Sequence, residues 1–147
     1  MFDKFTSEAT NFKFDDSDTP YQKLEKMFQF YFDYIVENPS MIQFLGMVDV
    51  YVGTSVYDSK DFTTLDQHGK RLDIVLENII REGQAIGCMK KDYSPRDYAV
   101  TINNSLIALG TRTAIYLPNT ILLQQGYTWK LLQIQGKILL ESLKVSQ

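Results

Sequence analysis

The residue types that most often act as a catalytic base, a nucleophile or a metal ligand are scarce here: one histidine, His68, and one cysteine, Cys88. His68 lies in a predicted helix with Leu65 and Leu72 on the same side. It is either a proton-sensing group that faces a cavity or a histidine with an ordinary structural partner, which we favour. Cys88, in a predicted turn, is either a redox-sensitive thiol or a structural residue, and again we favour the second. Because these two residues cannot form a nucleophile–base pair or a metal cluster, we expect no enzyme, no metal and no cofactor.

Aromatic side chains are abundant: nine Phe, nine Tyr and one Trp make up 13% of the chain. Aromatic rings fill cores and also line pockets for flat or cationic organic ligands, and the core is their commoner role. The carboxylates near these rings, Asp33, Glu37 and Asp49, either hold a cationic ligand or belong to a solvated helix face, which we favour. Asn103 lies on the apolar side of its predicted helix, where a buried amide needs a backbone group, a water or a ligand as its partner.

Length and composition are typical of one compact domain. The chain has 147 residues, 44% of them hydrophobic and 22% charged, with a formal net charge of -3. A free-standing nucleic-acid-binding protein usually has an excess of basic residues, and a single cysteine excludes an internal disulfide framework. The apolar runs are far shorter than the roughly 20 residues that a membrane-spanning helix needs, and the first residues lack the layout of a secretory signal. We therefore expect a soluble, cytoplasmic protein that makes no contact with a membrane.

Hydrophobic periodicity predicts helices along most of the chain. One helix starts at Thr19-Pro20, because threonine is a good N-cap and proline fits the first helical position, and it stops at Asn38-Pro39. Its apolar residues follow a period of about 3.6, with Phe30 and Tyr34 off the main stripe, so we expect burial on more than one side. The sequence thus predicts an all-α bundle of about five to six helices. Later helices are expected over residues 41–52, 61–83, 95–117 and 128–145, with a loop over 53–60, a turn region over 81–92 and a linker over 119–127.

The last predicted helix is apolar over more than half of its circumference. A terminal helix of this kind needs partners on two sides, and its own domain supplies only one of them. We expect the other to be a second copy of the chain, because two-fold dimers are the commonest oligomers. The helix that starts at Pro95 carries a strip of small residues, which lets another helix approach closely.

The stretch from Ile79 to Tyr116 has a distinctive order of helix ends and small residues. A long helix ends in Ile-Ile-Arg-Glu-Gly-Gln-Ala-Ile-Gly, and a turn and cap follow as Lys-Asp-Tyr-Ser-Pro-Arg-Asp-Tyr-Ala. The next helix reads Ile-Asn-Asn-Ser-Leu-Ile-Ala-Leu-Gly-Thr-Arg-Thr-Ala-Ile-Tyr. This pattern resembles the C-terminal domain of the TetR family of transcriptional repressors, and the order of helices from about Pro20 to Gln147 fits that domain.

The resemblance implies an N-terminal helix-turn-helix unit that binds DNA, followed by a helical ligand-binding and dimerisation domain. Residues 1–19 do not match such a DNA-binding unit, so we expect them to be the remnant of the connecting helix and loop. Residues 20–147 are then the ligand-binding and dimerisation domain. DNA would be bound only through the missing N-terminal unit, under allosteric control by a small hydrophobic or aromatic effector.

The resemblance also implies which residues form the sites. The ligand cavity is expected among the helices that carry Phe28, Phe32, Phe44, Val48, Tyr51, Ile79, Asn103 and Ile107. The homodimer interface is expected on the last two helices, with Ala114, Leu131, Ile138 and Leu139. Two other classes of protein stay open: a stand-alone helical protein that binds a hydrophobic small molecule and, least favoured, a small helical enzyme.

Overall fold

The computed structural model describes residues 2–54, 60–116 and 126–145, and these residues form helices without a strand. This confirms the predicted all-α fold. Residues 89 and 144 form a single isolated antiparallel bridge. Most of the predicted loop over 53–60 and of the linker over 119–127 lies outside the described residues. The helices are α1 (Phe2–Thr10), α2 (Pro20–Glu37), α3 (Pro39–Thr54), α4 (Lys60–Ala85), α5 (Pro95–Tyr116) and α6 (Tyr127–Leu143).

The predicted start and end of α2 are confirmed by its caps. The Thr19 hydroxyl accepts a hydrogen bond from the Gln22 backbone N–H at 3.3 Å, and the Gln22 side chain accepts one from the Thr19 N–H at 2.8 Å. This reciprocal capping box satisfies two N–H groups that the helix leaves unpaired. At the other end, the Asn38 N–H donates to the Tyr34 carbonyl at 3.0 Å, and Pro39 begins the next helix.

Helix α4 continues past the predicted end at Gly83 and stops two residues later. A Cβ atom on Gly83 would lie 2.5 Å from the sulfur of Met89. This glycine therefore allows the Met89 side chain to pack closely against α4. The helix is ended by Gly87 instead, which has a φ of 78°. The Cys88 N–H donates to the Gly83 carbonyl and the Gly87 N–H to the Gln84 carbonyl, which is the Schellman arrangement.

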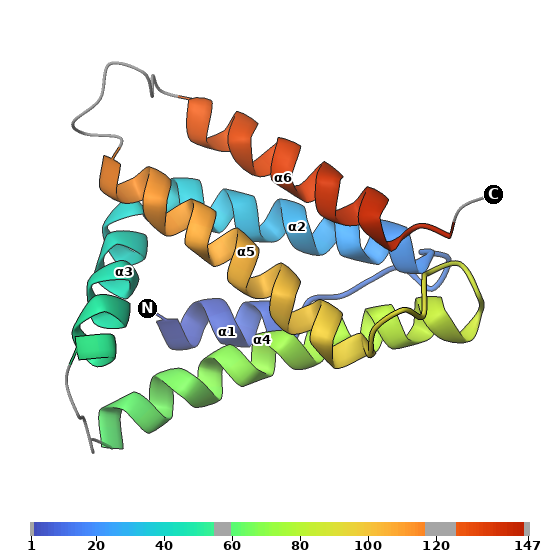
Figure 1. The fold of residues 1–147 in the computed structure, drawn as a ribbon, viewed down its shortest axis with the longest axis horizontal. Helices are drawn as coiled ribbons and strands as arrows, with labels where there is room; N and C mark the ends of the chain where they lie inside the picture. The colour runs from blue at the N-terminus through green and yellow to red at the C-terminus, as the bar shows by residue number, and fades with distance from the viewer. Residues whose placement is uncertain (1, 55–59, 117–125, 146–147) are drawn as a thin grey trace.

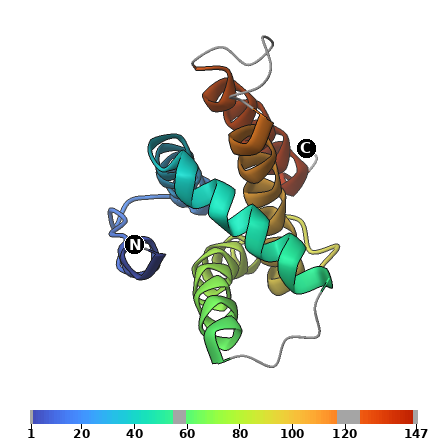
Figure 2. The same ribbon diagram turned by 90° about the vertical axis from the view of Figure 1, so that its left-hand side faces the viewer.

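The long helices pack around a shared apolar core. Helix α4 packs against α1, α2 and α5, while α6 packs against α2 and α5 (Figure 1). Helix α3 crosses one end of this group, as the view from that end shows (Figure 2). The largest fully buried side chains are Leu24, Met27, Phe28, Tyr31, Leu72, Leu76, Ile80, Met89, Leu106, Leu132 and Leu143.

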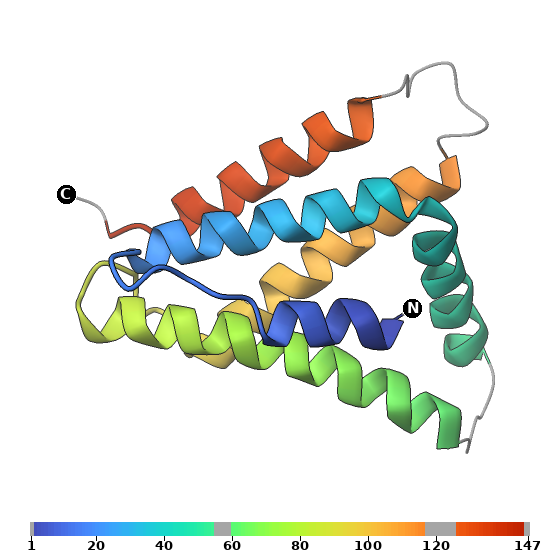
Figure 3. The same ribbon diagram turned by 180° about the vertical axis from the view of Figure 1, so that it is seen from behind.

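Helix α1 runs beside α4 and covers the second apolar side of α2 (Figure 3). The ring of Phe5 stacks on Phe30 and Tyr34, with centroid separations of 5.3 and 4.0 Å. Its edge meets Tyr31, with the centroids 5.5 Å apart. The prediction that α2 is buried on more than one side is therefore confirmed, and α1 supplies the cover.

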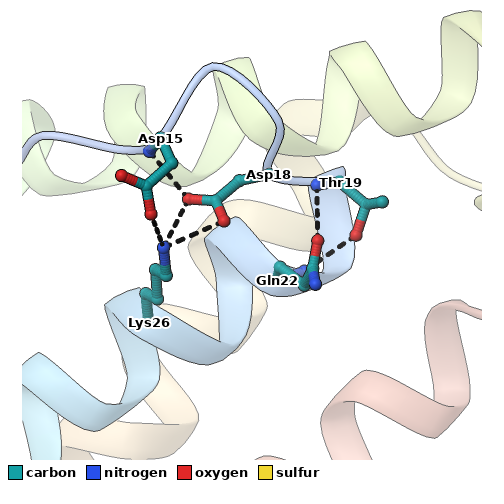
Figure 4. A network of polar contacts seen from close by, with 5 residues as sticks. All are labelled: Asp15, Asp18, Thr19, Gln22 and Lys26. Atoms are coloured by element: carbon teal, nitrogen blue, oxygen red, sulfur yellow. Dashed lines mark hydrogen bonds and ion pairs between the residues drawn. The ribbon is translucent and has the colours of Figure 1, made fainter.

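The segment that joins α1 to α2 is fastened to α2 by one lysine (Figure 4). Lys26 Nζ lies 2.6 Å from an oxygen of Asp15 and 2.7 Å from an oxygen of Asp18. The Asp15 backbone N–H also donates to the Asp18 carboxylate at 2.9 Å. Hydrogen bonding to Lys26 is the main reason why the pKa of Asp18 is lowered. These contacts hold the segment close to the first turns of α2.

In the described part of the chain, every helix is too short or too polar to cross a lipid bilayer.

Candidate functional site

An asparagine of α5 and an aspartate of α4 form a hydrogen-bonded pair, and the charge of that aspartate acts on a buried tyrosine of α2. Tyr31 of α2 is 1% exposed and Asn103 of α5 is 4% exposed. The Asn103 side-chain Nδ2 donates to Oδ1 of Asp73, on α4, at 2.8 Å. Asp73 is half-buried and its charge acts on the Tyr31 hydroxyl. We call Tyr31, Asp73 and Asn103 the polar cluster.

The carboxylate of Asp73 fixes the orientation of the Asn103 amide. An ionised carboxylate only accepts hydrogen bonds, so the amide must present its NH2 group to Asp73. Asn103 Oδ1 then faces away, and it has no hydrogen-bond partner among the described residues. The buried Tyr31 hydroxyl also lacks a partner there. A buried polar atom without a partner costs about 1–3 kcal/mol, so each of these two atoms requires an explanation.

The polar cluster lies in a region of negative charge, which affects the pKa values of its members. Burial, and after it the charge of Asp73, raise the pKa of Tyr31, so its hydroxyl stays protonated at neutral pH. Burial also raises the pKa of Asp73, although the hydrogen bond from Asn103 and the charge of Arg96 act against that rise. Glu77 adds a second negative charge nearby. A positive group inside the cluster would therefore find favourable partners.

A second candidate site is an open groove of about 640 Å³ between α2 and α6. Phe28 and Phe32 line it from α2, and Gly136 and Leu140 line it from α6. The helices meet closely here, because a Cβ atom on Gly136 would lie 2.7 Å from Cζ of Phe32. The other lining residues are Thr19, Tyr21, Gln22, Glu25, Gln29, Gln133, Lys137, Glu141 and Lys144, so the groove carries charges of both signs.

The described members of the eight expected ligand-binding residues lie in different surroundings, and their assignment to one cavity stays a prediction. Phe28 and Phe32 line the groove, and Asn103 belongs to the polar cluster. Ile79 is buried, whereas Phe44 is 50% exposed. Of the remaining three, Val48 and Ile107 are half-buried and the side chain of Tyr51 lies outside the described residues.

Sequence reasoning missed two members of the polar cluster. Tyr31 falls on the predicted apolar stripe of the helix that starts at Thr19-Pro20, and a position on such a stripe does not show what its hydroxyl would meet. Asp73 precedes the buried Leu76 and Ile80 by three and seven residues, which is the spacing of one helix face. A carboxylate on the buried face of a predicted helix was the signal in the sequence that could have identified Asp73 as a site residue. Asn103 itself was expected to pair with a backbone group, a water or a ligand, and its partner is instead a carboxylate.

The other candidate residues named from the sequence do not form a site among the described residues. Asp33 and Glu37 are exposed, as expected of a solvated helix face, and Asp33 accepts a bond from Gln29 at 3.3 Å. Cys88 is half-buried, and burial raises the pKa of its thiol, which disfavours the reactive thiolate. The side chains of Asp49 and His68 lie outside the described residues. Within the described ranges, no three histidine, cysteine or carboxylate side chains cluster as a metal site would require.

Helix α6 carries exposed apolar side chains. Ile134 and Ile138 are 48% and 57% exposed, and Leu131 and Leu139 are half-buried. Ala114 differs from these expected interface residues, because it is 4% exposed and its carbonyl accepts a hydrogen bond from Gln43 of α3 at 2.6 Å. Ala114 thus packs inside its own chain.

Comparison with known proteins identifies one family. A family model described as "Tetracyclin repressor-like, C-terminal domain" matches residues 20–112. The match runs from the start of α2 through most of α5 and includes all three residues of the polar cluster. No curated protein and no solved structure matches the chain.

Proposed function

The chain belongs to the tetracycline-repressor-like C-terminal domain family, and from this membership we propose that it is the effector-sensing and dimerisation domain of a TetR-like transcriptional repressor. It binds a small hydrophobic or aromatic molecule in the core between α2, α4 and α5. The bound molecule changes an equilibrium between conformations and undergoes no reaction. We propose that it acts in the cytoplasm.

The observation that carries the proposal is the polar cluster. Unpartnered buried oxygens lower the stability of a core, and apolar residues of similar size would avoid that loss. The loss is recovered when a ligand provides the missing hydrogen bonds. Asn103 Oδ1 and the Tyr31 hydroxyl are therefore the atoms that we expect an effector to contact.

Dimerisation is proposed to use α5 and α6. The exposed Ile134 and Ile138 are four residues apart on α6 and form an apolar stripe with Leu131. The exposed positions of α5 include Thr101 and Ala108, whose small side chains allow a second helix to come close. A second copy of the chain would cover both surfaces.

Helix α1 is the proposed route from effector to DNA. We propose that residues 1–19 are the end of a connecting helix with its loop, and that residues 20–147 are the sensing domain. Phe5 of α1 meets the ring of Tyr31 directly, so a molecule that displaces Tyr31 also displaces α1. The effector regulates only if it binds one position of α1 more tightly than the other.

Native mass spectrometry of the purified chain tests this function. We expect a mass of twice the 17.0-kDa chain and an additional mass of a few hundred daltons from a carried molecule. Asn103→Leu should lose the additional mass, whereas the control Asn104→Leu, at the exposed neighbouring position, should keep it. A monomer without additional mass, in the wild type and in both variants, would contradict the proposal.

A further inference from the structure

The atoms of the polar cluster define what kind of molecule it takes. Resting on the function proposed above, we infer that the effector carries a positively charged hydrogen-bond donor, an amine on an aromatic or apolar body, which binds among Asn103 Oδ1, the Asp73 carboxylate and the Tyr31 hydroxyl.

The first argument counts donors and acceptors. The cluster offers the Asn103 amide oxygen and the Asp73 carboxylate as acceptors, and its amide NH2 already donates to Asp73. The protonated Tyr31 hydroxyl can accept one hydrogen bond and donate another. An ammonium group has three N–H donors and no acceptor, so it complements this set. Hydrogen bonds to charged groups are the stronger kind.

The second argument is the local charge. Asp73 and the neighbouring Glu77 are acidic, and Arg96, whose positive charge lowers the pKa of Asp73, is exposed at the start of α5. Solvent screens an exposed charge more than a buried one. A carboxylate ligand would meet Asp73 as a like charge and would leave Asn103 Oδ1 without a donor. A cation gains from both groups.

The third argument is the group of aromatic rings that contact Tyr31. The Tyr31 ring meets Phe5 and Phe30 edge-on, with centroids 5.5 and 6.4 Å away. Phe5 also stacks on Tyr34. Rings of this kind accommodate an apolar body. The aromatic and acidic features of the site therefore select the same type of molecule.

Three probes with the same apolar body separate the possibilities: 4-phenylbutylamine, 4-phenylbutyrate and butylbenzene. Calorimetric titration of the full chain should show the amine binding at least about tenfold more tightly than the acid, because hydrogen bonds to charged groups exceed the free energy of a tenfold difference. Asn103→Leu and Asp73→Asn should each weaken amine binding by about fivefold or more. Both should leave butylbenzene binding within about twofold, while Asn104→Leu and Asp33→Asn should leave all three affinities unchanged.

The possible failures are distinct. If the acid binds as tightly as the amine, or if the preference for the amine survives in Asn103→Leu and Asp73→Asn, the inference is wrong although the domain still binds small molecules. If none of the probes binds to the wild type, the inference fails and the proposed sensing function loses its support as well. Circular dichroism of each variant establishes that it is folded, and Asp73→Asn keeps an acceptor for Asn103 in case the leucine variant unfolds.

Discussion

Asn103 on α5 donates a hydrogen bond to Asp73 on α4, with 2.8 Å between Nδ2 and Oδ1. This contact joins two helices that pack along each other, and it directs the remaining amide oxygen into a region without a protein partner among the described residues. The hydrogen bond between Asn103 and Asp73 links α5 to α4, and it leaves Asn103 Oδ1 as a buried acceptor without a donor among the described residues.

Asp73→Asn should change how stability depends on pH. Because the pKa of Asp73 is raised in the folded protein, the folded state holds this proton more tightly than the unfolded state. Wild type should therefore lose stability relative to Asp73→Asn as pH rises from about the ordinary value, 3.8, through the raised pKa. The difference should reach a fraction of a kcal/mol, up to about 1 kcal/mol, since solvent screens a half-buried group.

Urea denaturation of both proteins from acid to neutral pH measures this difference. Asp33→Asn is the matched control, because Asp33 is an exposed carboxylate on α2. A difference between wild type and Asp73→Asn that stays constant across the range would show that burial of Asp73 does not oppose its charge.

Gly136→Ala should destabilise the domain by about 1–3 kcal/mol. The new Cβ would lie 2.7 Å from Cζ of Phe32 and 3.2 Å from Cδ2 of Phe28, and these rings are 5% and 2% exposed. The gain of about 1 kcal/mol in helix propensity is too small to offset the overlap. Thermal unfolding of Gln133→Ala, one turn earlier on an exposed position, supplies the reference. A Gly136→Ala variant as stable as that reference would mean that α6 can move away from α2 at little cost.

Lys26→Met should loosen the segment between α1 and α2 while the domain stays folded. Lys26 binds Asp15 and Asp18 together, and the Asp15 N–H depends on Asp18 for its acceptor (Figure 4). We expect the backbone amides of residues 15–18 to exchange with solvent at least about threefold faster. Hydrogen exchange of Lys13→Met, an exposed lysine of the same segment, is the comparison. Equal exchange in the two variants would assign the order of the segment to other contacts.

Ile138→Glu should disrupt the proposed dimer. Ile138 belongs to the exposed apolar stripe of α6 and is 57% exposed, so a glutamate there costs the single chain little but would be buried in a dimer. Sedimentation velocity should show a dissociation constant about tenfold higher or more. Val36→Glu, which replaces a 43% exposed residue on α2, should dimerise like the wild type. Dimers of equal strength in both variants would move the interface away from this stripe.

Helix ends were predictable from the sequence because their signals are local. Thr19-Pro20 and Asn38-Pro39 mark the limits of α2. At the start of α5, the Ser94 hydroxyl caps the Asp97 N–H at 3.1 Å, as its sequence indicated. Gly83 was misleading, since a glycine that ends a helix and one that allows a close contact look the same without knowledge of Met89.

The contents of the site were less predictable, because they depend on how helix faces are paired. The apolar stripe of α2 is wide enough to face both the core and α6, and Phe28 and Phe32 lie toward the groove with α6. Asn103 was recognised as a buried amide, but its partner comes from a helix thirty positions earlier in the sequence. Spacing within one helix carries no information about that pairing.

If a small molecule enters the core at the polar cluster, as we propose, the side-chain amide of Asn103 reports it directly. Its NH2 signals in a ¹⁵N–¹H spectrum are identified by their loss in Asn103→Leu. On titration with 4-phenylbutylamine, we predict that these signals shift while those of Gln133, which lines the groove between α2 and α6, stay in place. Shifts at Gln133 with an unchanged Asn103 would place binding in the groove and contradict the account.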